Sequence, residues 1–389
     1  MDVVANRLKR LPVFLFVEIS RKIAQKRAEG ADVITFGIGD PDIATPTSIL
    51  DHLSKASLEP SNHRYPDPEG LLEFREAVSA WYKTRFGVIL NPATEIISLI
   101  GAKEGIGHAA FGLVNPGDIV LQPEPAYPAY NSGTILADGE PYWMPLKEEN
   151  DWLPDLDVIP KEIAQRAKVM WLNYPNNPTG AVASFEYLER AVNYCKEYEI
   201  TLLHDACYTE ISFDQYQPIS LLEIPGAKDI AVEFHSLSKS YNMTGWRIGM
   251  AAGNADVIKT LFEVKSNLDS GVPQAIQRMA IEALTGPQEY ICERNNIYQA
   301  RRDKLIPALA NLGLRVQSPV AGLYIWAGIP EGYSSAEYAT LLLDELDIVV
   351  TPGSGYGPSG EGYLRFSLTL SDDDLDKAIT RLQGWKRNP

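Results

Sequence analysis

The chain has 389 residues, a hydrophobic fraction of 45% and a formal net charge of -16. This length accommodates one large hydrophobic core and a smaller second domain, because single cores stop growing near roughly 250 to 300 residues. The acidic balance argues against nucleic acids and anionic membranes as partners. No apolar run approaches the roughly 18 residues that span a bilayer, and residues 1–9 lack a signal-peptide core, so we expect a cytoplasmic protein.

The cysteines and histidines give no sign of a metal centre. Cys195, Cys207 and Cys292 are odd in number and show no Cys-x-x-Cys spacing, which predicts neither a disulfide framework nor a zinc cluster. The five histidines form no His-x-x-x-His pair. We therefore expect reduced thiols and no metal site.

The first two thirds of the chain predict an arm followed by a large α/β domain. Residues 1–45 are too few to fold alone, so we expect them to pack on the C-terminal part or on a partner subunit. Short β-branched runs then alternate with helical patterns such as residues 184–198. This alternation predicts a mostly parallel sheet covered by helices, with ligands at the carboxyl ends of its strands. The predicted strands are residues 95–100, 119–122, 169–173, 201–204, 230–234 and 248–252.

The pattern of predicted helices and strands changes after Gly286-Pro287. Long helical stretches are followed by short strands at residues 323–326 and 363–368 and by a last helix, which Ser371 caps with three aspartates in its first turn. These features predict a second, α+β domain. We therefore expect an arm at 1–45 that includes part of the small domain, a large domain at 46–285 and a small C-terminal domain at 286–389.

Lys239 ends a Ser-x-Ser-Lys motif that begins at Ser236, directly after the predicted strand 230–234, and Arg247 follows in the same segment. An aldehyde cofactor that carries a phosphate needs such a set. The amine forms a Schiff base, while hydroxyls and a guanidinium bind the phosphate. Taken alone, the motif more often marks a solvated loop lysine.

Asp205 comes directly after the predicted strand 201–204, and Tyr208 follows three residues later. A carboxylate inside a covered sheet is costly unless it meets a cation. A protonated pyridine nitrogen is one such cation, and pairing with it would make the ring an electron sink. A helix cap or a pair with a buried arginine is the alternative.

Two further strand ends carry candidate ligand groups. Asn177 lies in a turn that Pro175, Pro178 and Gly180 fix, so its amide is aimed rigidly, although such a turn is often only structural. Gly101 opens a helix after the predicted strand 95–100, and free backbone N–H groups at a helix start bind anions. Each signal is weak alone.

In combination and in order, these segments resemble fold type I pyridoxal-phosphate aminotransferases of the aspartate aminotransferase class, over about residues 11–382. The resemblance implies an α/β fold in which a large domain with a mostly parallel seven-stranded sheet between helices joins a smaller α+β domain. It implies pyridoxal 5'-phosphate on Lys239, with Asp205 at the pyridine nitrogen and Tyr208 and Asn177 at the phenolic oxygen. The segments that carry it are Gly101-Ala102-Lys103, Tyr127, Asn177 before Pro-Thr-Gly, Asp205 with Tyr208, Ser-x-Ser-Lys239 and Arg247.

Residues 36–42, 62–66, 69–71, 74–75, 241–247 and 360–365 are similar to the bacterial branch of the LL-diaminopimelate aminotransferases. This narrower resemblance implies a homodimer with shared active sites, in which Tyr65 reaches the neighbouring subunit's cofactor. Phe14 stands where the family often has a substrate-contacting tyrosine. Glu69, Lys103 and Asn267 are the candidate partners of the substrate's distal ammonium and carboxylate, and Glu69 lies one position from the family's glutamate. The implied phosphate-binding residues are Ala102, Lys103, Ser236, Ser238 and Arg247, and the implied substrate-binding residues are Gly39, Lys103, Tyr127, Asn177, Asn267 and Arg365.

The implied reaction is ping-pong transamination from LL-2,6-diaminopimelate to 2-oxoglutarate, giving tetrahydrodipicolinate and glutamate in lysine biosynthesis. Arg365 suits bidentate binding of the α-carboxylate, and Lys239 would move the proton. A broader aspartate, alanine or aromatic aminotransferase would use the same residues, as would a carbon–sulfur lyase. A non-catalytic effector-binding domain of this fold is a further alternative.

Overall fold

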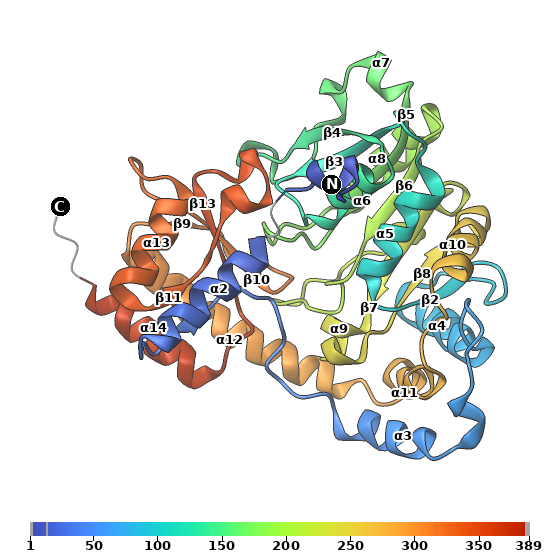
Figure 1. The fold of residues 1–389 in the computed structure, drawn as a ribbon, viewed down its shortest axis with the longest axis horizontal. Coiled ribbons are helices and arrows are strands. Elements are labelled where there is room, and N and C mark those ends of the chain that lie inside the picture. The colour runs from blue at the N-terminus through green and yellow to red at the C-terminus, as the bar shows by residue number, and fades with distance from the viewer. Residues whose placement is uncertain (1–2, 13–14, 386–389) are drawn as a thin grey trace.

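The computed structural model describes residues 3–12 and 15–385, and in it two lobes lie side by side, joined by one long helix (Figure 1). The large lobe is built on a seven-stranded sheet with the order β2-β8-β7-β6-β5-β3-β4. Strand β8 runs antiparallel to both neighbours and the other pairs are parallel, so the predicted mostly parallel sheet is confirmed. The strands are β2 (Ile96–Leu99), β3 (Ile119–Glu124), β4 (Glu140–Pro145), β5 (Ala167–Asn173), β6 (Thr201–Asp205), β7 (Ala231–Ser236) and β8 (Gly249–Gly253).

All six predicted strands of this sheet are present, but β4 was not predicted. Its run contains Pro141 and Pro145, which cannot donate to a ladder and therefore argue against a central strand. The structure places β4 at the edge of the sheet, where it pairs only with β3. An edge strand tolerates proline, and this explains the omission.

Helices cover both faces of the large sheet, and the alternation of side chains along its strands fills two cores. On β5, Val169 and Trp171 join the core beneath α5 and α10, whereas Met170 and Leu172 join the core beneath α8. Ser184 caps α8 by accepting a hydrogen bond from the Tyr187 N–H at 3.2 Å. The helices of this lobe are α3 (Thr47–Ser57), α4 (Leu72–Phe86), α5 (Ala102–Leu113), α6 (Ala129–Leu136), α7 (Lys161–Ala164), α8 (Phe185–Glu197), α9 (Leu237–Ser240), α10 (Ala255–Leu268) and α11 (Gln274–Thr285).

The small lobe is α+β, as predicted. Its antiparallel sheet has the order β12-β13-β10-β9, and β1 pairs with β11 in a separate parallel ladder. Ser371 caps the last helix, since its Oγ accepts from the Asp374 N–H at 3.1 Å. The elements are α12 (Glu289–Asn311), β9 (Arg315–Val316), β10 (Tyr324–Gly328), α13 (Ser335–Leu346), β11 (Ile348–Val349), β12 (Thr351–Pro352), β13 (Tyr363–Ser367) and α14 (Asp372–Gly384).

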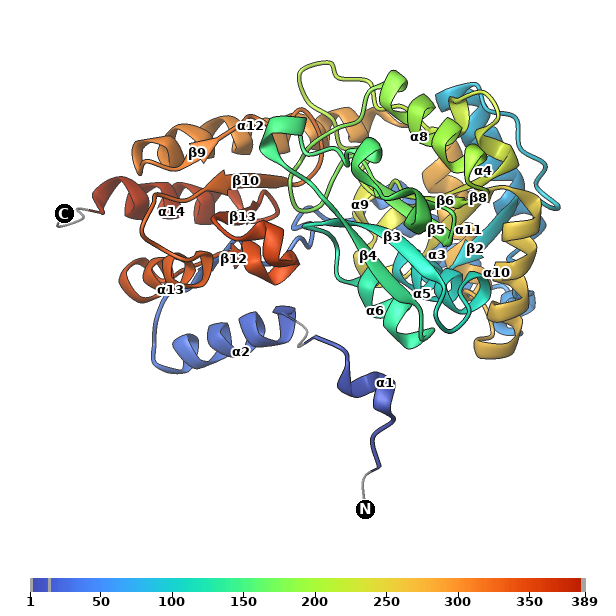
Figure 2. The same cartoon turned by 90° about the horizontal axis from the view of Figure 1, so that it is seen from above.

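The first part of the chain reaches both lobes. Helix α1 (Asn6–Lys9) lies at the periphery of the molecule beside α6 (Figure 2), and nearby Arg10 pairs with Asp138 beyond α6 at 3.1 Å. After α2 (Leu15–Ala28), strand β1 (Ile34–Thr35) joins the small lobe through β11. Phe14 lies outside the described residues. Within the described chain, no helix combines the length and the apolar character needed to cross a bilayer.

Candidate active site

A cavity of about 360 Å³ lies between the lobes, at the carboxyl ends of β5, β6 and β7 and at the start of α5. A larger cavity of about 1280 Å³ lies along α12, away from these strand ends, and lacks the predicted chemistry. The smaller cavity gathers every predicted site residue except Tyr65, Asn267 and the candidate Glu69. Those that line it are Gly39, Ala102, Lys103, Tyr127, Asn177, Asp205, Tyr208, Ser236, Ser238, Lys239, Arg247 and Arg365.

Lys239 sits on the four-residue helix α9, which begins directly after β7. Ser236 Oγ accepts from the Ser238 N–H at 3.2 Å and so caps the start of this helix. The Lys239 Nζ reaches across the cavity and donates to the carbonyl oxygen of Gly39, in the segment that follows β1. The amine therefore stands at the centre of the cavity, between strand end and opposite wall.

Asp205 lies on the floor of the cavity, with 4% of its surface exposed. Its Oδ2 accepts from the Tyr130 hydroxyl at 2.7 Å, and its Oδ1 accepts from the Cys207 N–H at 3.2 Å. Asn173 Nδ2 donates to the Asp205 carbonyl at 2.7 Å, which ties the ends of β5 and β6 together. These bonds orient the carboxylate and leave it lining the cavity.

Tyr208, Asn177 and Arg365 form a connected wall. Asn177 Nδ2 lies 3.5 Å from the Tyr208 hydroxyl, which lies 3.0 Å from the Tyr324 hydroxyl. Arg365 donates to Asn177 Oδ1 and to the Gly37 carbonyl, each at 2.9 Å, and its guanidinium carbon lies 4.1 Å from the centre of the Tyr324 ring. Burial, and then Tyr324, raise the pKa of Tyr208 well above its usual value, so its hydroxyl stays protonated at neutral pH.

An anion cradle closes the other side of the cavity. Gly101 has a φ of 74° and precedes Ala102, the first residue of α5, and a Cβ on Gly101 would overlap the Arg247 guanidinium. Arg247 Nη1 donates to the Thr244 carbonyl at 2.8 Å and lies 3.4 Å from Ser238 Oγ. Burial, and then the charge of Arg247, lower the pKa of Lys103. Two cations beside a helix start fit a phosphate dianion.

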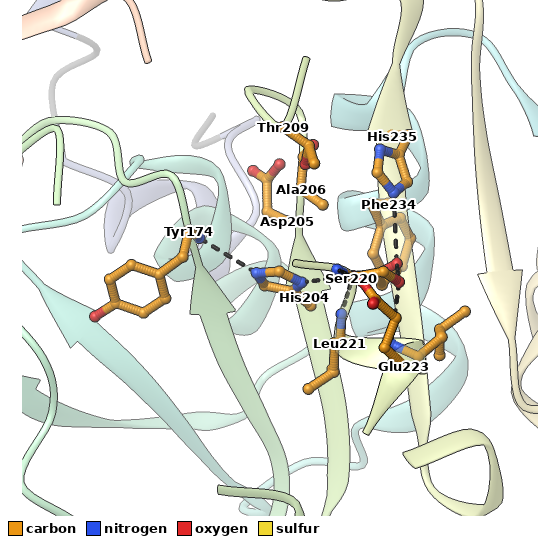
Figure 3. Close-up of polar contacts among 12 residues, drawn as sticks. Tyr174, His204, Asp205, Ala206, Thr209, Ser220, Leu221, Glu223, Phe234 and His235 are labelled. Atoms are coloured by element: carbon orange, nitrogen blue, oxygen red, sulfur yellow. Dashed lines mark hydrogen bonds and ion pairs between the residues drawn. The ribbon is translucent and has the colours of Figure 1, made fainter. Parts of the chain in front are cut away.

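A buried polar layer lies behind the floor (Figure 3). Glu233 on β7 is fully buried and accepts from Ser220 Oγ at 2.5 Å, from the Leu221 N–H at 2.7 Å and from His204 Nδ1 at 2.9 Å. The Tyr174 N–H donates to His204 Nε2 at 3.3 Å, which makes Nδ1 the protonated nitrogen. Burial acts to raise the pKa of Glu233, but the hydrogen bond from His204 and the nearby His235 hold it well below its usual value.

Tyr65 and Asn267 lie outside this cavity. Tyr65 is 87% exposed, and Asn267 is exposed with its Nδ2 donating to the Glu263 carbonyl at 2.7 Å. Gln274 Nε2 donates to the Tyr65 carbonyl at 3.4 Å, so Tyr65 lies beside the start of α11. Glu69 does not line the cavity either. The roles implied for these three residues stay predictions.

Two tyrosines of the site were missed from the sequence. Tyr130 looks like one more apolar position of a helix, and its partner Asp205 is 75 positions away. Tyr324 looks like the core of a short strand, although its hydroxyl closes on Gly39, where a Cβ would overlap it. The only hint in the sequence was that Tyr130 stands three residues after Tyr127, a predicted site residue. Ile38, Asp40, Ile106, Cys207 and Thr244 also line the cavity without having been predicted.

The residues present fit pyridoxal 5'-phosphate. An oriented buried carboxylate suits the pyridine nitrogen, a cationic cradle suits the phosphate, and Lys239 lines the same cavity. The class I and II aminotransferase family matches residues 31–382, which is most of the chain. This protein therefore belongs to the class I and II aminotransferases, which are pyridoxal-phosphate-dependent enzymes.

Individual relatives narrow the comparison. The chain is 56% identical over 382 residues to an LL-diaminopimelate aminotransferase of Dehalococcoides mccartyi, covering 98% of each chain. It is 53% identical to LL-diaminopimelate aminotransferase 2 of a Nostoc species, covering 97% of each. Among solved structures, substrate-bound BacF from Bacillus subtilis superposes with a TM-score of 0.94 at 38% identity, covering 98% of each chain.

Proposed function

We propose that this aminotransferase moves an amino group from LL-2,6-diaminopimelate to 2-oxoglutarate, in lysine biosynthesis. The observation that carries the proposal is the 56% identity to a relative of that name over 98% of both chains. The cavity supports it, because it combines a guanidinium for the α-carboxylate with further polar groups. The products would be glutamate and a keto acid that cyclises to tetrahydrodipicolinate.

When bound, pyridoxal 5'-phosphate supplies the aldehyde that takes the donor's amine and a ring that accepts electrons. Arg365 would bind the donor's α-carboxylate through its fork, held in place by Asn177 and the Gly37 carbonyl. Asp205 would hold a proton on the ring nitrogen, with Tyr130 fixing one carboxylate oxygen. Lys239 Nζ, once displaced by the donor, would take the proton from the α-carbon and deliver it to the cofactor's C4′.

The phosphate would be held by the start of α5 and by the segment after β7. Ala102 offers a backbone N–H at the first turn of α5, where four N–H groups lack partners within the helix. Ser236 and Ser238 offer hydroxyls, and Arg247 and Lys103 offer positive charge. This arrangement would anchor the cofactor independently of Lys239.

We propose a cytoplasmic homodimer whose subunits complete one another's sites. Tyr65 and Asn267 support this proposal, because both are exposed and lie outside the cavity of their own chain. The free state of Cys195, Cys207 and Cys292 supports a reducing compartment. Within the subunit we propose a cofactor-binding domain at 46–285 and a smaller domain formed by 286–389 with the arm at 1–45.

A comparison of donors tests the substrate. The purified, cofactor-loaded protein is mixed separately with LL-diaminopimelate, meso-diaminopimelate, aspartate and alanine, and the conversion of cofactor to its aminated form is followed by absorbance. We expect LL-diaminopimelate to react fastest. Faster conversion with aspartate or alanine would instead assign a broader aminotransferase, and release of a thiol from a cysteine conjugate would assign a carbon–sulfur lyase.

Lys239→Ala tests the central residue. We expect the variant to retain the cofactor through the phosphate cradle and to lose turnover, because the proton carrier is gone. Lys259→Ala on the exposed side of α10 removes one lysine far from the chemistry and is the matched control. Turnover that survived in Lys239→Ala would contradict the proposed role.

A further inference from the structure

The helix that joins the two lobes contacts the backbone of Lys239. Helix α12 starts beside the large lobe and ends in the small lobe, where Lys304 pairs with Asp376 of α14 at 2.9 Å (Figure 2). Near its start it carries Arg294, which is 2% exposed. Nη1 of Arg294 donates to the carbonyl oxygens of Lys239, at 3.0 Å, and of Ser240, while Nη2 donates to the Glu210 carbonyl at 2.6 Å.

These bonds support a helix that cannot stand alone. Helix α9 has four residues, and a single helical turn is unstable in isolation. The carbonyl groups of its last turn lack partners within the helix, and Arg294 donates to two of them. The Tyr290 hydroxyl adds a bond to the Ser240 carbonyl at 3.1 Å. A cation at this end also complements the helix dipole.

The same face of α12 also binds the segment of Gly39, whose carbonyl accepts from the Lys239 amine. Arg301 lies two turns after Arg294, so their side chains share a face. Arg301 binds both carboxylate oxygens of Asp42, at 2.7 and 2.9 Å, shortly after Gly39, the residue whose carbonyl contacts the Lys239 amine. Helix α12 therefore fixes both the backbone from which Lys239 extends and the segment at which its amine arrives.

The bonding of Arg294 differs from that of the other buried arginines on this helix. Its acceptors among the described residues are backbone carbonyls and the side-chain amide oxygen of Asn295, whereas Arg302 binds the carboxylate of Asp214 at 3.0 Å. The Glu210 carboxylate pairs with Arg85 at 3.1 Å instead. Burying a cation without a carboxylate is costly, so an apolar side chain would serve packing better. Position 294 therefore requires the several N–H donors of a guanidinium, which bond three carbonyl groups at once.

We propose that Arg294 is a positioning residue for transamination, which holds the backbone of Lys239 so that its amine stays aligned with the cofactor site. The inference rests on the proposed role of Lys239. It assigns to Arg294 no contact with cofactor or substrate.

The test uses cofactor-loaded Arg294→Met and Arg294→Lys, assayed with whichever donor reacts fastest in the donor comparison. A misplacement of about 1 Å costs up to roughly a hundredfold in rate, so we expect kcat of Arg294→Met to fall about thirtyfold with KM changed less than about threefold. Arg294→Lys keeps the charge and one donor head, and we expect it to recover part of the loss.

Arg302→Met is the matched control, because Arg302 lies on the same helix and is 3% exposed. We expect it to lower the thermal midpoint as Arg294→Met does and to leave kcat within about twofold. Equal kcat losses in both variants, or an Arg294→Met with wild-type kcat, would overturn the proposal. If Arg294→Met fails to fold, Arg294→Lys carries the test: its kcat should still fall, and a wild-type kcat would overturn the proposal. A Lys239→Ala variant that turned over would instead contradict the role of the lysine itself.

Discussion

Tyr130→Phe removes one hydroxyl from the floor of the site. The Tyr130 ring stacks on Trp171 with ring centres 4.9 Å apart, and its hydroxyl donates to Asp205 Oδ2 at 2.7 Å. Phenylalanine keeps the ring contact and leaves Oδ2 without this donor, while Oδ1 keeps the Cys207 N–H at 3.2 Å. The substitution therefore isolates the hydrogen bond from the packing.

The size of the effect follows from the charge of the acceptor. A hydrogen bond to a charged group contributes about 1.5 to 3 kcal/mol, and each 1.4 kcal/mol is roughly tenfold in rate. Because Oδ2 loses the bond that orients the Asp205 carboxylate toward the ring nitrogen, we expect the amine-transfer half-reaction at saturating donor to slow by about tenfold or more. Stopped-flow absorbance of the cofactor in a single turnover measures that rate.

Tyr298→Phe is the control, since Tyr298 is fully buried and its hydroxyl lacks a hydrogen-bond partner among the described residues. It should change the rate less than about twofold. A Tyr130→Phe enzyme that binds the cofactor fully and reacts as fast as Tyr298→Phe would refute the assignment of Tyr130 as a support of Asp205.

Three further predictions concern the surroundings. Glu233→Gln should lower the thermal midpoint, because hydrogen bonds to a charged group contribute about 1.5 to 3 kcal/mol each and the buried Glu233 carboxylate accepts three of them. The fold lowers the pKa of Glu233, so the stability that its carboxylate contributes is complete at a pH above the usual pKa of a glutamate and is lost as the pH falls below it. The difference in thermal midpoint between wild type and variant should therefore narrow from pH 7 toward pH 4. A difference that stays constant would contradict this. Arg365→Lys should raise KM for donor and acceptor about tenfold, as a point charge replaces a bidentate fork, and unchanged KM values would place the carboxylate elsewhere. Gly39→Ala should impair activity, since its Cβ would overlap the Tyr324 hydroxyl and lie 2.8 Å from two of its ring carbons, and a variant with wild-type activity would contradict this.

The sequence predicted elements well where burial and periodicity agree. Strand β5 was expected at residues 169–173 and runs Ala167–Asn173, because both of its faces are buried and its apolar run is continuous. Helix α8 was expected at 184–198 and runs Phe185–Glu197 with its Ser184 cap. Strand β4 was not predicted; its run holds two prolines, and only the tertiary structure shows that it lies at an edge, where proline is tolerated.

The site was predicted where its residues follow strand ends, and missed where a contact crosses the fold. Asp205, Asn177 and Lys239 each stand just after an apolar run, which makes their exposure to a ligand readable from the sequence. Tyr324 and Arg294 act through partners 116 and 55 positions away, and nothing local distinguishes them from core and surface residues. Such residues require the tertiary structure.

The segment of β1 and Gly37 bonds with residues near the end of the chain, so the active site is completed late in synthesis. The large sheet spans residues 96–253 and can form while the rest of the chain is still being made. The Gly37 carbonyl, by contrast, receives its bonds from Thr351 and from Arg365, which lie 314 and 328 positions later. Contacts of such separation form only after long loops close. The wall that faces Lys239 is therefore assembled last, and a nascent chain can bury most of its core before it can bind a donor's carboxylate.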